Sequence, residues 1–175
     1  VMVGTQVIAK GHDLPMVTLV GVVSADVGLN LPEFRASERV FQLICQVSGR
    51  AGRGHKAGQV VIQTYQPEHY AITAASDQNY TAFFDEEIRY RHIYKHPPYS
   101  RIIKLMRQDT DPNTCEQEAN RLSKSLQRQQ AIWGLSDTDI IGPTPSFPSR
   151  VRGHYRWHIL LRGPNPRKLL ETIGM

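Results

Sequence analysis

The sequence predicts an α/β fold built in two incomplete parts, an open α/β sheet followed by a small α+β sandwich. Two short apolar runs, residues 17–23 and 59–64, flank a helical pattern, which is the strand–helix–strand order of an open α/β sheet. From residue 100 onward the order is strand, helix, strand, strand, helix, which is typical of a small α+β domain. Pro97 and Pro98 separate the two parts, because proline lacks an N–H and restricts the residue before it.

The composition is that of a folded, basic protein. The chain has 175 residues, of which 40% are hydrophobic, so it can bury a core and is not disordered. Its 21 Lys and Arg residues exceed its 16 Asp and Glu residues and give a net charge of +5, which is compatible with an anionic partner. Cys45 and Cys115 lie far apart, so we expect free thiols and neither a zinc site nor a disulfide framework.

The sequence carries no signal for a membrane or for secretion. It has no apolar run of about 18 residues and no basic region followed by a long apolar one, which predicts a cytoplasmic protein with no membrane partner. Because the chain starts at Val1 and stops abruptly after Gly174 and Met175, we expect a piece of a longer chain.

The first part begins with a loop and a buried strand. Residues 1–3 predict the end of a strand, and Gly11 and Pro15 lie in a loop that presents Asp13. Residues 17–23 form an apolar, β-branched run that predicts a strand covered on both faces of a parallel sheet, although periodicity alone does not exclude a helix.

A helix and a second strand follow. Ser37 is a favourable N-cap, so we expect a helix from there through Phe41 and Ile44 toward Val47. Residues 59–64 predict a further short buried strand.

A helical connector joins the two parts. The composition of residues 68–94 predicts one connecting helix, on which Glu86 and Glu87 form a solvated face. The predicted organisation is therefore a first part at residues 1–66, a connector at 67–96 and a second part at 97–175.

The second part opens with a strand and a long helix. Residues 100–106 predict the strand, and Asp111 starts a helix to about residue 133. Its periodicity places three apolar residues on one face, namely Ala119, Leu122 and Leu126.

The remaining elements are two strands and the start of a helix. A strand begins at residues 140–141 and is interrupted by residues 142–145, after which we expect residues 146–153 to be irregular. Residues 155–162 predict a strand whose alternation separates two faces. One face has Tyr155, Trp157, Ile159 and Leu161, and the other has Arg156, His158, Leu160 and Arg162. A helix begins at residue 167, and one closing strand of the sandwich is missing.

An octapeptide at residues 46–53, Gln-Val-Ser-Gly-Arg-Ala-Gly-Arg, is the strongest chemical signal in the chain. Arg50 and Arg53 are three residues apart, a spacing that points both side chains the same way on a helix. Gly49 and Gly52 remove side-chain bulk beside them, so that a ligand could approach closely. Two converging guanidinium groups suit phosphate oxygens. The alternative is a basic helix end on a solvated surface.

Several segments together resemble a known family. Residues 4–15, followed at a fixed distance by residues 46–53, are similar to motifs V and VI of superfamily 2 helicases. The continuation resembles the replication-restart helicases of the PriA, or primosomal protein N′, family in four segments: Phe-Arg-Ala-Ser-Glu-Arg at 34–39, Gln-Thr-Tyr-Gln-Pro-Glu-His at 63–69, Pro-Pro-Tyr at 97–99 and Arg-Val-Arg-Gly-His-Tyr-Arg-Trp at 150–157. Ser24 and Ser48 depart from the family pattern, where an acidic residue and alanine are usual.

The resemblance implies a fold and an activity. Residues 1–66 would be most of the second RecA-like lobe, of the P-loop NTPase type, and residues from about 97 a ribosomal-protein-like α+β domain. The family unwinds DNA with 3′ to 5′ polarity at the expense of ATP and assembles the primosome. Its phosphate-binding loop, acidic Mg²⁺ motif and zinc module lie upstream, so most ligands of ATP and Mg²⁺, and all of those of zinc, are expected outside this chain. The chain alone is not expected to hydrolyse ATP.

The resemblance also implies an ATP site at the second lobe. Arg50 and Arg53 match arginine fingers, which stabilise the charge of the transferring phosphoryl group, and Gln46 would bridge toward the nucleotide. Gly11 and Asp13 match the motif V loop and, with Gly49, would contact ATP, although Asp13 could merely cap its loop.

Two groups of residues are candidates for DNA contacts. Thr5, Gln6 and Lys10 could hold the DNA backbone or could form an exposed helix face. Residues 142–175 carry six Lys or Arg residues against one acid, and aromatic rings among them could stack on unpaired bases. Trp157 could instead be a core residue. The DNA-binding candidates of this second group are Arg150, Arg152, Tyr155, Arg156 and Trp157.

Other partners follow from these assignments. We expect forked or single-stranded DNA, primosome proteins and single-strand-binding proteins as partners. No metal site is expected, because His92 and His96 have no third ligand nearby. The alternative function is a non-enzymatic module that binds single-stranded nucleic acid or docks a primosome protein.

Overall fold

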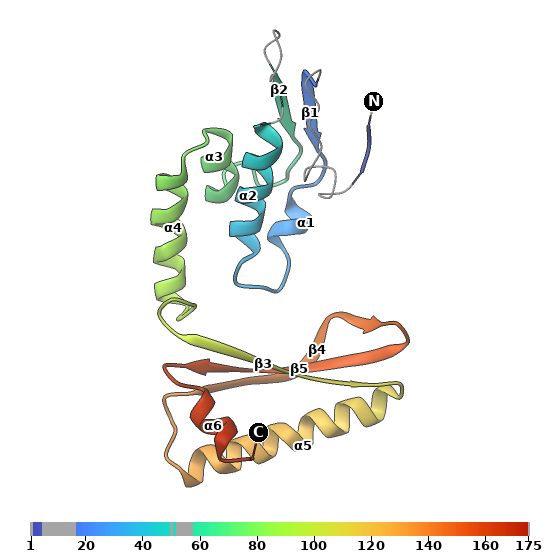
Figure 1. Cartoon of the computed structure of the whole chain (residues 1–175), viewed down its shortest axis with the longest axis vertical. Helices are drawn as coiled ribbons and strands as arrows, with labels where there is room; N and C mark the ends of the chain where they lie inside the picture. The colour runs from blue at the N-terminus through green and yellow to red at the C-terminus, as the bar shows by residue number, and fades with distance from the viewer. Residues whose placement is uncertain (1, 5–16, 50, 52–57, 175) are drawn as a thin grey trace. The chain divides into compact units, whose positions relative to one another are not determined.

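The computed structural model describes residues 2–4, 17–49, 51 and 58–174 (Figure 1). The chain divides into two compact units, Val1–Tyr90 and Arg91–Met175. Each unit has its own hydrophobic core, and the two cores share no residue.

A parallel strand pair and the helix between its strands form the first half of the first unit. Strand β1 (Leu19–Val22) pairs in parallel with β2 (Gln59–Ile62), and Val22 lies opposite Ile62. The short helix α1 (Asp26–Leu29) and helix α2 (Ala36–Ser48) lie between them in the chain. The predicted strand–helix–strand order is therefore confirmed in the described residues.

The prediction that the first strand is covered on both faces is wrong for the described residues. Leu19 is 60% exposed and Val61 is 53% exposed, whereas Val22 and Ile62 pack against the core. Successive strand residues point to opposite faces, so only one face of this pair packs on the core. An apolar run does not reveal this, because β-branched residues favour strands whether one or both faces are covered.

Helix α2 begins one residue before the predicted N-cap. The N–H of Ala36 already donates to the Glu33 carbonyl (3.0 Å), and that of Arg39 donates to the Arg35 carbonyl (3.0 Å). Arg35 therefore occupies the N-cap position and Ser37 lies in the first turn. A turn at residues 33–36 starts the helix before Ser37 is reached.

Two helices, and not one connecting helix, follow β2. Helices α3 (Tyr70–Ser76) and α4 (Tyr80–Ile93) are separated by a turn in which Gln78 has a φ of +52°. The Asn79 side chain accepts a hydrogen bond from the N–H of Ala82 (3.0 Å) and so caps α4. Asparagine favours such caps over helix interiors, which accounts for the break.

Helices α3 and α4 complete the core of the first unit. The rings of Phe41 on α2 and Phe83 on α4 stack with centroids 4.2 Å apart. Ala71 and Ala75 of α3 are fully buried, and their small side chains let α3 lie close to α2.

Glu87 does not belong to a solvated helix face. It is 6% exposed, and its carboxylate accepts a hydrogen bond from the Tyr70 hydroxyl (2.6 Å), which joins α4 to α3. The prediction is wrong for Glu87 because it considered α4 alone and not the helix packed beside it.

The second unit is an antiparallel sheet with helices on one face (Figure 1). Its strands, in the order β3-β5-β4 within the described ranges, are β3 (Arg101–Asp109), β4 (Asp139–Val151) and β5 (His154–Gly163). Helices α5 (Pro112–Ile132) and α6 (Arg167–Glu171) provide the other layer. Ile159 and Leu161 of β5 pack with Leu126 of α5 and Leu169 of α6, which confirms the predicted inward face of β5.

The start of α5 and its buried face are also confirmed. The Asp111 carboxylate accepts a hydrogen bond from the N–H of Thr114 (2.7 Å), and Pro112 follows as the first helical residue. Ala119 and Leu126 are buried, and Leu122 packs against the same core.

Strand β4 is longer and more irregular than predicted. It continues through residues 142–145 and to Val151, with two shifts in its pairing to β5, between Ile141 and Thr144 and between Pro145 and Arg150. Gly142 permits the first shift, because its φ is +100° and a Cβ there would lie 2.9 Å from the His158 carbonyl oxygen. The interruption predicted at residues 142–145 is therefore wrong, because β4 is an edge strand of the described sheet and an edge strand tolerates proline.

Candidate functional site

The C-terminal end of α2 carries the described part of the octapeptide. Gln46 is exposed on the last turn of α2, and Gly49 is its C-cap, with its N–H donating to the Cys45 carbonyl (3.0 Å). A Cβ at Gly49 would meet the Cys45 oxygen at 3.5 Å, an ordinary contact, so α2 itself does not require glycine there. Gln46 and Gly49 are three residues apart and so lie on the same side of the helix end.

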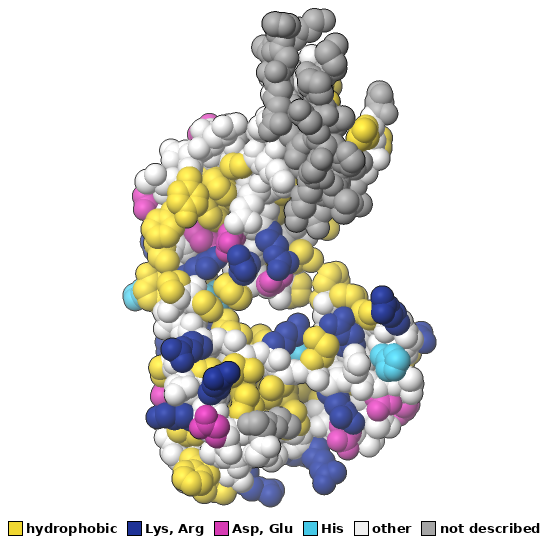
Figure 2. All heavy atoms as spheres, viewed as in Figure 1, with side chains coloured by type: hydrophobic (Ala, Val, Ile, Leu, Met, Phe, Trp, Pro, Cys, Tyr) yellow, Lys and Arg dark blue, Asp and Glu magenta, His cyan; other side chains and the backbone are white. Residues whose placement is uncertain are grey.

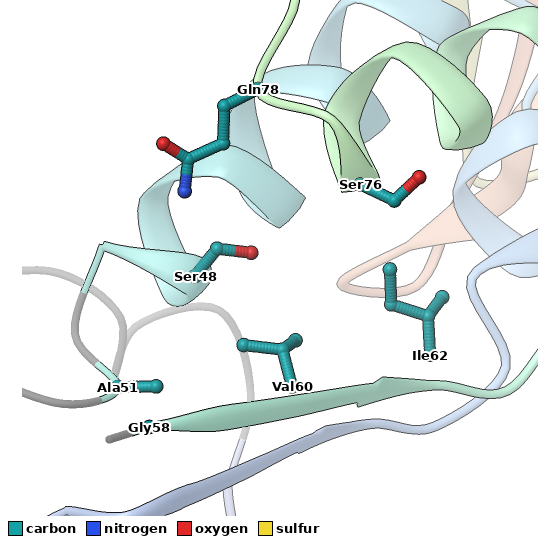
Figure 3. Close-up of a pocket in the computed structure, with 7 residues that line it drawn as sticks. All are labelled: Ser48, Ala51, Gly58, Val60, Ile62, Ser76 and Gln78. Atoms are coloured by element: carbon teal, nitrogen blue, oxygen red, sulfur yellow. The ribbon is translucent and has the colours of Figure 1, made fainter. Parts of the chain in front are cut away.

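A cavity of about 380 Å³ opens beside this helix end. Figure 3 shows Val60 and Ile62 of β2 directed toward the helix ends that carry Ser48 and Ser76. The remaining described lining residues are Ala51, Gly58 and Gln78. These described residues offer hydroxyl and amide groups over an aliphatic floor, and none of them has a charged side chain. They can hydrogen-bond a polar ligand.

The candidate residues outside the described ranges are seven: Thr5, Gln6, Lys10, Gly11, Asp13, Arg50 and Arg53. Helix α2 ends at Ser48, so Arg50 and Arg53 come after its last residue in the chain. Of the predicted ATP-site residues, Gln46 and Gly49 are therefore the two that the structure describes.

Asp26 is a buried acid that the sequence did not single out. Its carboxylate accepts hydrogen bonds from the Thr64 hydroxyl (2.8 Å) and from the N–H of Tyr65 (3.1 Å). Burial by itself would raise the pKa of Asp26, but the hydrogen bonds from Thr64 and Tyr65 outweigh it and hold that pKa below its usual value. Asp26 follows β1 and Thr64 follows β2, and this position at the carboxyl ends of parallel strands could have signalled the pair.

The β4–β5 hairpin carries the five predicted DNA-binding residues of the second unit. Arg150 lies over the Tyr155 ring, with its guanidinium carbon 5.0 Å from the ring centroid. Arg152 has a φ of +49° and forms, with Gly153, the two-residue turn between the strands. Arg156 donates to the Met106 sulfur (3.1 Å).

The hairpin does not present these five side chains on one face. Arg156 lies on the face of β5 opposite the helices, whereas Trp157 shares the inward face with Ile159 and Leu161. Trp157 is half-buried. Its place on the inward face therefore favours packing over base stacking.

The face opposite the helices contains further polar residues that the sequence did not identify. The Ser146 hydroxyl lies 3.1 Å from His158 Nδ1, and Ser146 is 3% exposed. Burial and then the nearby Lys104 charge lower the pKa of His158 below its usual value. Lys104 pairs with Leu160, the neighbour of Ile159, so the alternation of β3 and β5 could have placed it on this face.

Arg162 on the same face has structural partners. It forms an ion pair with Asp139 (2.9 Å) and donates to the Tyr94 carbonyl (2.8 Å). Figure 2 likewise shows acidic side chains (magenta) among the Lys and Arg side chains (dark blue) of the second unit.

The described residues contain no group of three or more His, Cys, Asp or Glu placed to hold a metal ion. The His92 ring packs edge-on against the Tyr99 ring, with the ring centroids 4.8 Å apart. His96 lies beyond the end of α4. Among the same residues, no helix is long and apolar enough to cross a membrane.

Comparisons with known proteins identify the family. Residues 92–173 match the family described as primosomal protein N C-terminal domain. The chain is 50% identical over 166 residues to replication restart protein PriA of Chlamydia trachomatis, a match that covers 93% of this chain and 21% of that protein. It is 40% identical over 162 residues to the Bacillus subtilis protein of the same name, covering 93% of this chain and 20% of that protein.

A third relative extends over nearly the whole chain. The chain is 39% identical over 172 residues to replication restart protein PriA of Synechocystis sp., covering 98% of this chain and 20% of that protein. It therefore spans about a fifth of the length of the curated relatives it matches. Identity at this level over both units, together with the family match at residues 92–173, shows that the chain belongs to the replication restart protein PriA family.

Proposed function

We propose that this chain is the C-terminal part of an ATP-dependent 3′ to 5′ DNA helicase that acts in replication restart and primosome assembly. The observation that carries the proposal is the parallel β1–β2 pair, joined through α2, whose C-terminal end leads directly into Arg50 and Arg53. The name of the relatives, replication restart protein PriA, supports the same process.

The first unit is proposed to be part of the second RecA-like lobe of a superfamily 2 helicase. Arg50 and Arg53 would stabilise the charge that develops on the transferring phosphoryl group, an effect of roughly 10³ to 10⁵ in rate. Gln46, exposed near the end of α2, would bridge toward the nucleotide. Because α3 and α4 share a core with α2, they would move with this lobe when it moves on hydrolysis.

ATP and Mg²⁺ would need further ligands in addition to the residues that the structure describes. The described cavity beside α2 provides the hydroxyl groups of Ser48 and Ser76 and the Gln78 amide, which suit sugar or phosphate oxygens. The described residues that line this cavity carry no charge, so the positive charge would come from Arg50 and Arg53. Gly11, Asp13 and Gly49 are proposed as further contacts to ATP, and the remaining ligands of ATP, Mg²⁺ and zinc would lie upstream.

The second unit is proposed to bind DNA. Arg150, Arg152 and Arg156 are placed on one hairpin and would contact phosphates, and Tyr155 and Trp157 are the aromatic candidates beside them. Thr5, Gln6 and Lys10 would hold the backbone at the first unit. The proposed setting is the cytoplasm, with forked or single-stranded DNA, primosome proteins and single-strand-binding proteins as partners.

Substitution of the two arginines tests the proposal. In the longer protein of which this chain would be a part, Arg50→Ala or Arg53→Ala should lower DNA-stimulated ATP hydrolysis by about 10³-fold or more while ATP binding persists. The matched control is Arg39→Ala, which removes an exposed α2 arginine paired with Glu33 (2.7 Å) and should leave turnover unchanged. Wild-type turnover in both finger variants would refute the assignment.

A non-enzymatic role is the second candidate. The family match covers residues 92–173, which lie outside the predicted ATP site and favour a binding or docking module for that unit. Binding of the chain to single-stranded DNA as a function of salt separates the possibilities. Phosphate contacts give a steep negative slope of log K against log salt, whereas a flat slope indicates protein docking.

A further inference from the structure

Strand β4 bulges away from β5 between its two paired stretches. Pro145 pairs with Trp157 and Arg150 pairs with Tyr155, so four residues of β4, 146–149, lie between these pairs where β5 has only Arg156. The extra residues must leave the plane of the sheet, and Figure 1 shows β4 arching away from β5 near the hairpin turn.

Both ends of this bulge are fixed. At its start, Ser146 is buried, with its hydroxyl 3.1 Å from His158 Nδ1. At its end, Arg150 lies over the Tyr155 ring at 5.0 Å. The bulge is therefore a defined feature of the hairpin.

An aromatic ring projects from the bulge. Phe147 is 65% exposed, although it directly follows buried Ser146. Trp133, at the end of α5, has a similar exposed fraction of 63%, but its indole N–H donates a hydrogen bond to the Gln129 side chain (3.2 Å). A single exposed aromatic residue is common on protein surfaces, so exposure alone does not assign Phe147 a role.

The charge around Phe147 distinguishes it. The ten residues 147–156 contain three arginines and one histidine and no acidic residue. The nearest acid in the pairing is Asp109, opposite Tyr155, and its carboxylate accepts a hydrogen bond from the N–H of Asp111 (3.0 Å). The hairpin thus combines an exposed ring with a local excess of positive charge that is complementary to a phosphate backbone.

We infer that Phe147 stacks on an unpaired base of single-stranded DNA whose phosphates contact Arg150 and Arg152. The inference rests on the proposed function, because it takes DNA as the ligand, and it deepens that function by naming the stacking residue. In a duplex the faces of each base are covered by the neighbouring bases, so a phenyl ring can stack only on a base of an unpaired strand. Phe147 should therefore bind single-stranded DNA in preference to double-stranded DNA. Trp157, on the inward face, has a packing role in this scheme.

The test compares variants of the 175-residue chain. Fluorescence anisotropy would measure binding of a labelled 20-nucleotide mixed-sequence single strand and of the corresponding duplex across a salt series. Phe147→Ala should weaken single-strand binding by about 5- to 150-fold, the range for loss of one stacked base. Its effect on duplex binding should be less than about twofold, and its salt slope should equal that of the wild type, because no phosphate contact is lost.

Controls separate stacking from charge. Phe147→Trp should retain wild-type affinity, and Trp133→Ala should bind like the wild type. Arg150→Ala should reduce the salt slope by about 0.7, the value for one phosphate contact on a single strand. Photocrosslinking to a bromodeoxyuridine-substituted strand, followed by mass spectrometry, should place the crosslink at Phe147.

The outcomes distinguish the two proposals. No binding of the single strand by the wild-type chain would overturn both the DNA-binding proposal and this inference. Binding by the wild type with unchanged affinity in Phe147→Ala, or an equal loss on duplex and single strand, would overturn the inference alone. A crosslink at Trp157 in place of Phe147 would also overturn it.

Discussion

For single residues, the sequence predicted the chemistry of a side chain better than it predicted which other side chains that residue contacts. The octapeptide at residues 46–53 stood out because its residue types match phosphate chemistry. Asp26 and Glu87 did not, since their importance comes from segments distant in the chain, Thr64 for Asp26 and Tyr70 for Glu87. A sequence pattern shows which residues share an element and seldom shows which side chain meets them from another.

Asp26 yields a prediction at this scale. The pKa of Asp26 in the folded state is lower than the ordinary aspartate value of 3.8. The ionised carboxylate therefore stabilises the fold above pH 3.8, and this stabilisation is lost as the pH falls through the folded-state pKa. Asp26→Asn should therefore lower the urea midpoint at pH 7, and the difference from wild type should shrink near pH 3.

The control for this prediction is Asp85→Asn, a change at an exposed aspartate on α4, which should leave the midpoint nearly unchanged at both pH values. A difference between Asp26→Asn and wild type that stays constant from pH 7 to pH 3 would contradict the role assigned to Asp26.

At the scale of elements, patterns with a strong local cause were predicted well. Asp111 and Pro112 start α5 where expected, because the cap and the proline act within the first turn. The break between α3 and α4 and the continuity of β4 were missed. The first depends on the Asn79 cap, and the second depends on pairing with β5 that overrides the local effect of proline.

Substitution of Asn79 tests whether its side chain caps α4. Asn79→Ala removes the side-chain acceptor for the Ala82 N–H and should destabilise the first unit by about 1 kcal/mol in chemical denaturation. The matched change Asn113→Ala, at an exposed asparagine in the first turn of α5, should cost less than about 0.5 kcal/mol. Equal effects of the two changes would argue against the cap.

At the scale of the whole molecule, the sequence predicted two parts, and the structure has two units with separate cores. The residues of the octapeptide predicted phosphate chemistry, and the family resemblance implied that the ligand is ATP. Most of the candidate residues lie outside the described ranges, and Gln46 and Gly49 mark where the site would begin. The DNA-binding candidates fall on one hairpin, yet their distribution over two faces, and the exposure of Phe147, depend on a bulge whose register no sequence pattern specifies.

Because the two units have separate cores, a substitution in one core should destabilise that unit and leave the other unit unchanged. Leu126→Ala removes a fully buried side chain of the second unit and should cost about 2–5 kcal/mol. Hydrogen exchange should then accelerate in β5 and α5 and remain unchanged in α2. Phe41→Ala should produce the opposite pattern, and acceleration in both units by either change would contradict independent cores.

Unwinding polarity distinguishes a 3′ to 5′ helicase from other proteins that bind DNA. The longer protein of which this chain would be the C-terminal part should be incubated with ATP and partial duplexes that carry a single-stranded tail on either the 3′ or the 5′ side. A 3′ to 5′ helicase should displace the strand from the 3′-tailed duplex, and Arg50→Ala should abolish this. Displacement from the 5′-tailed duplex alone, or none with either substrate, would contradict the proposed function.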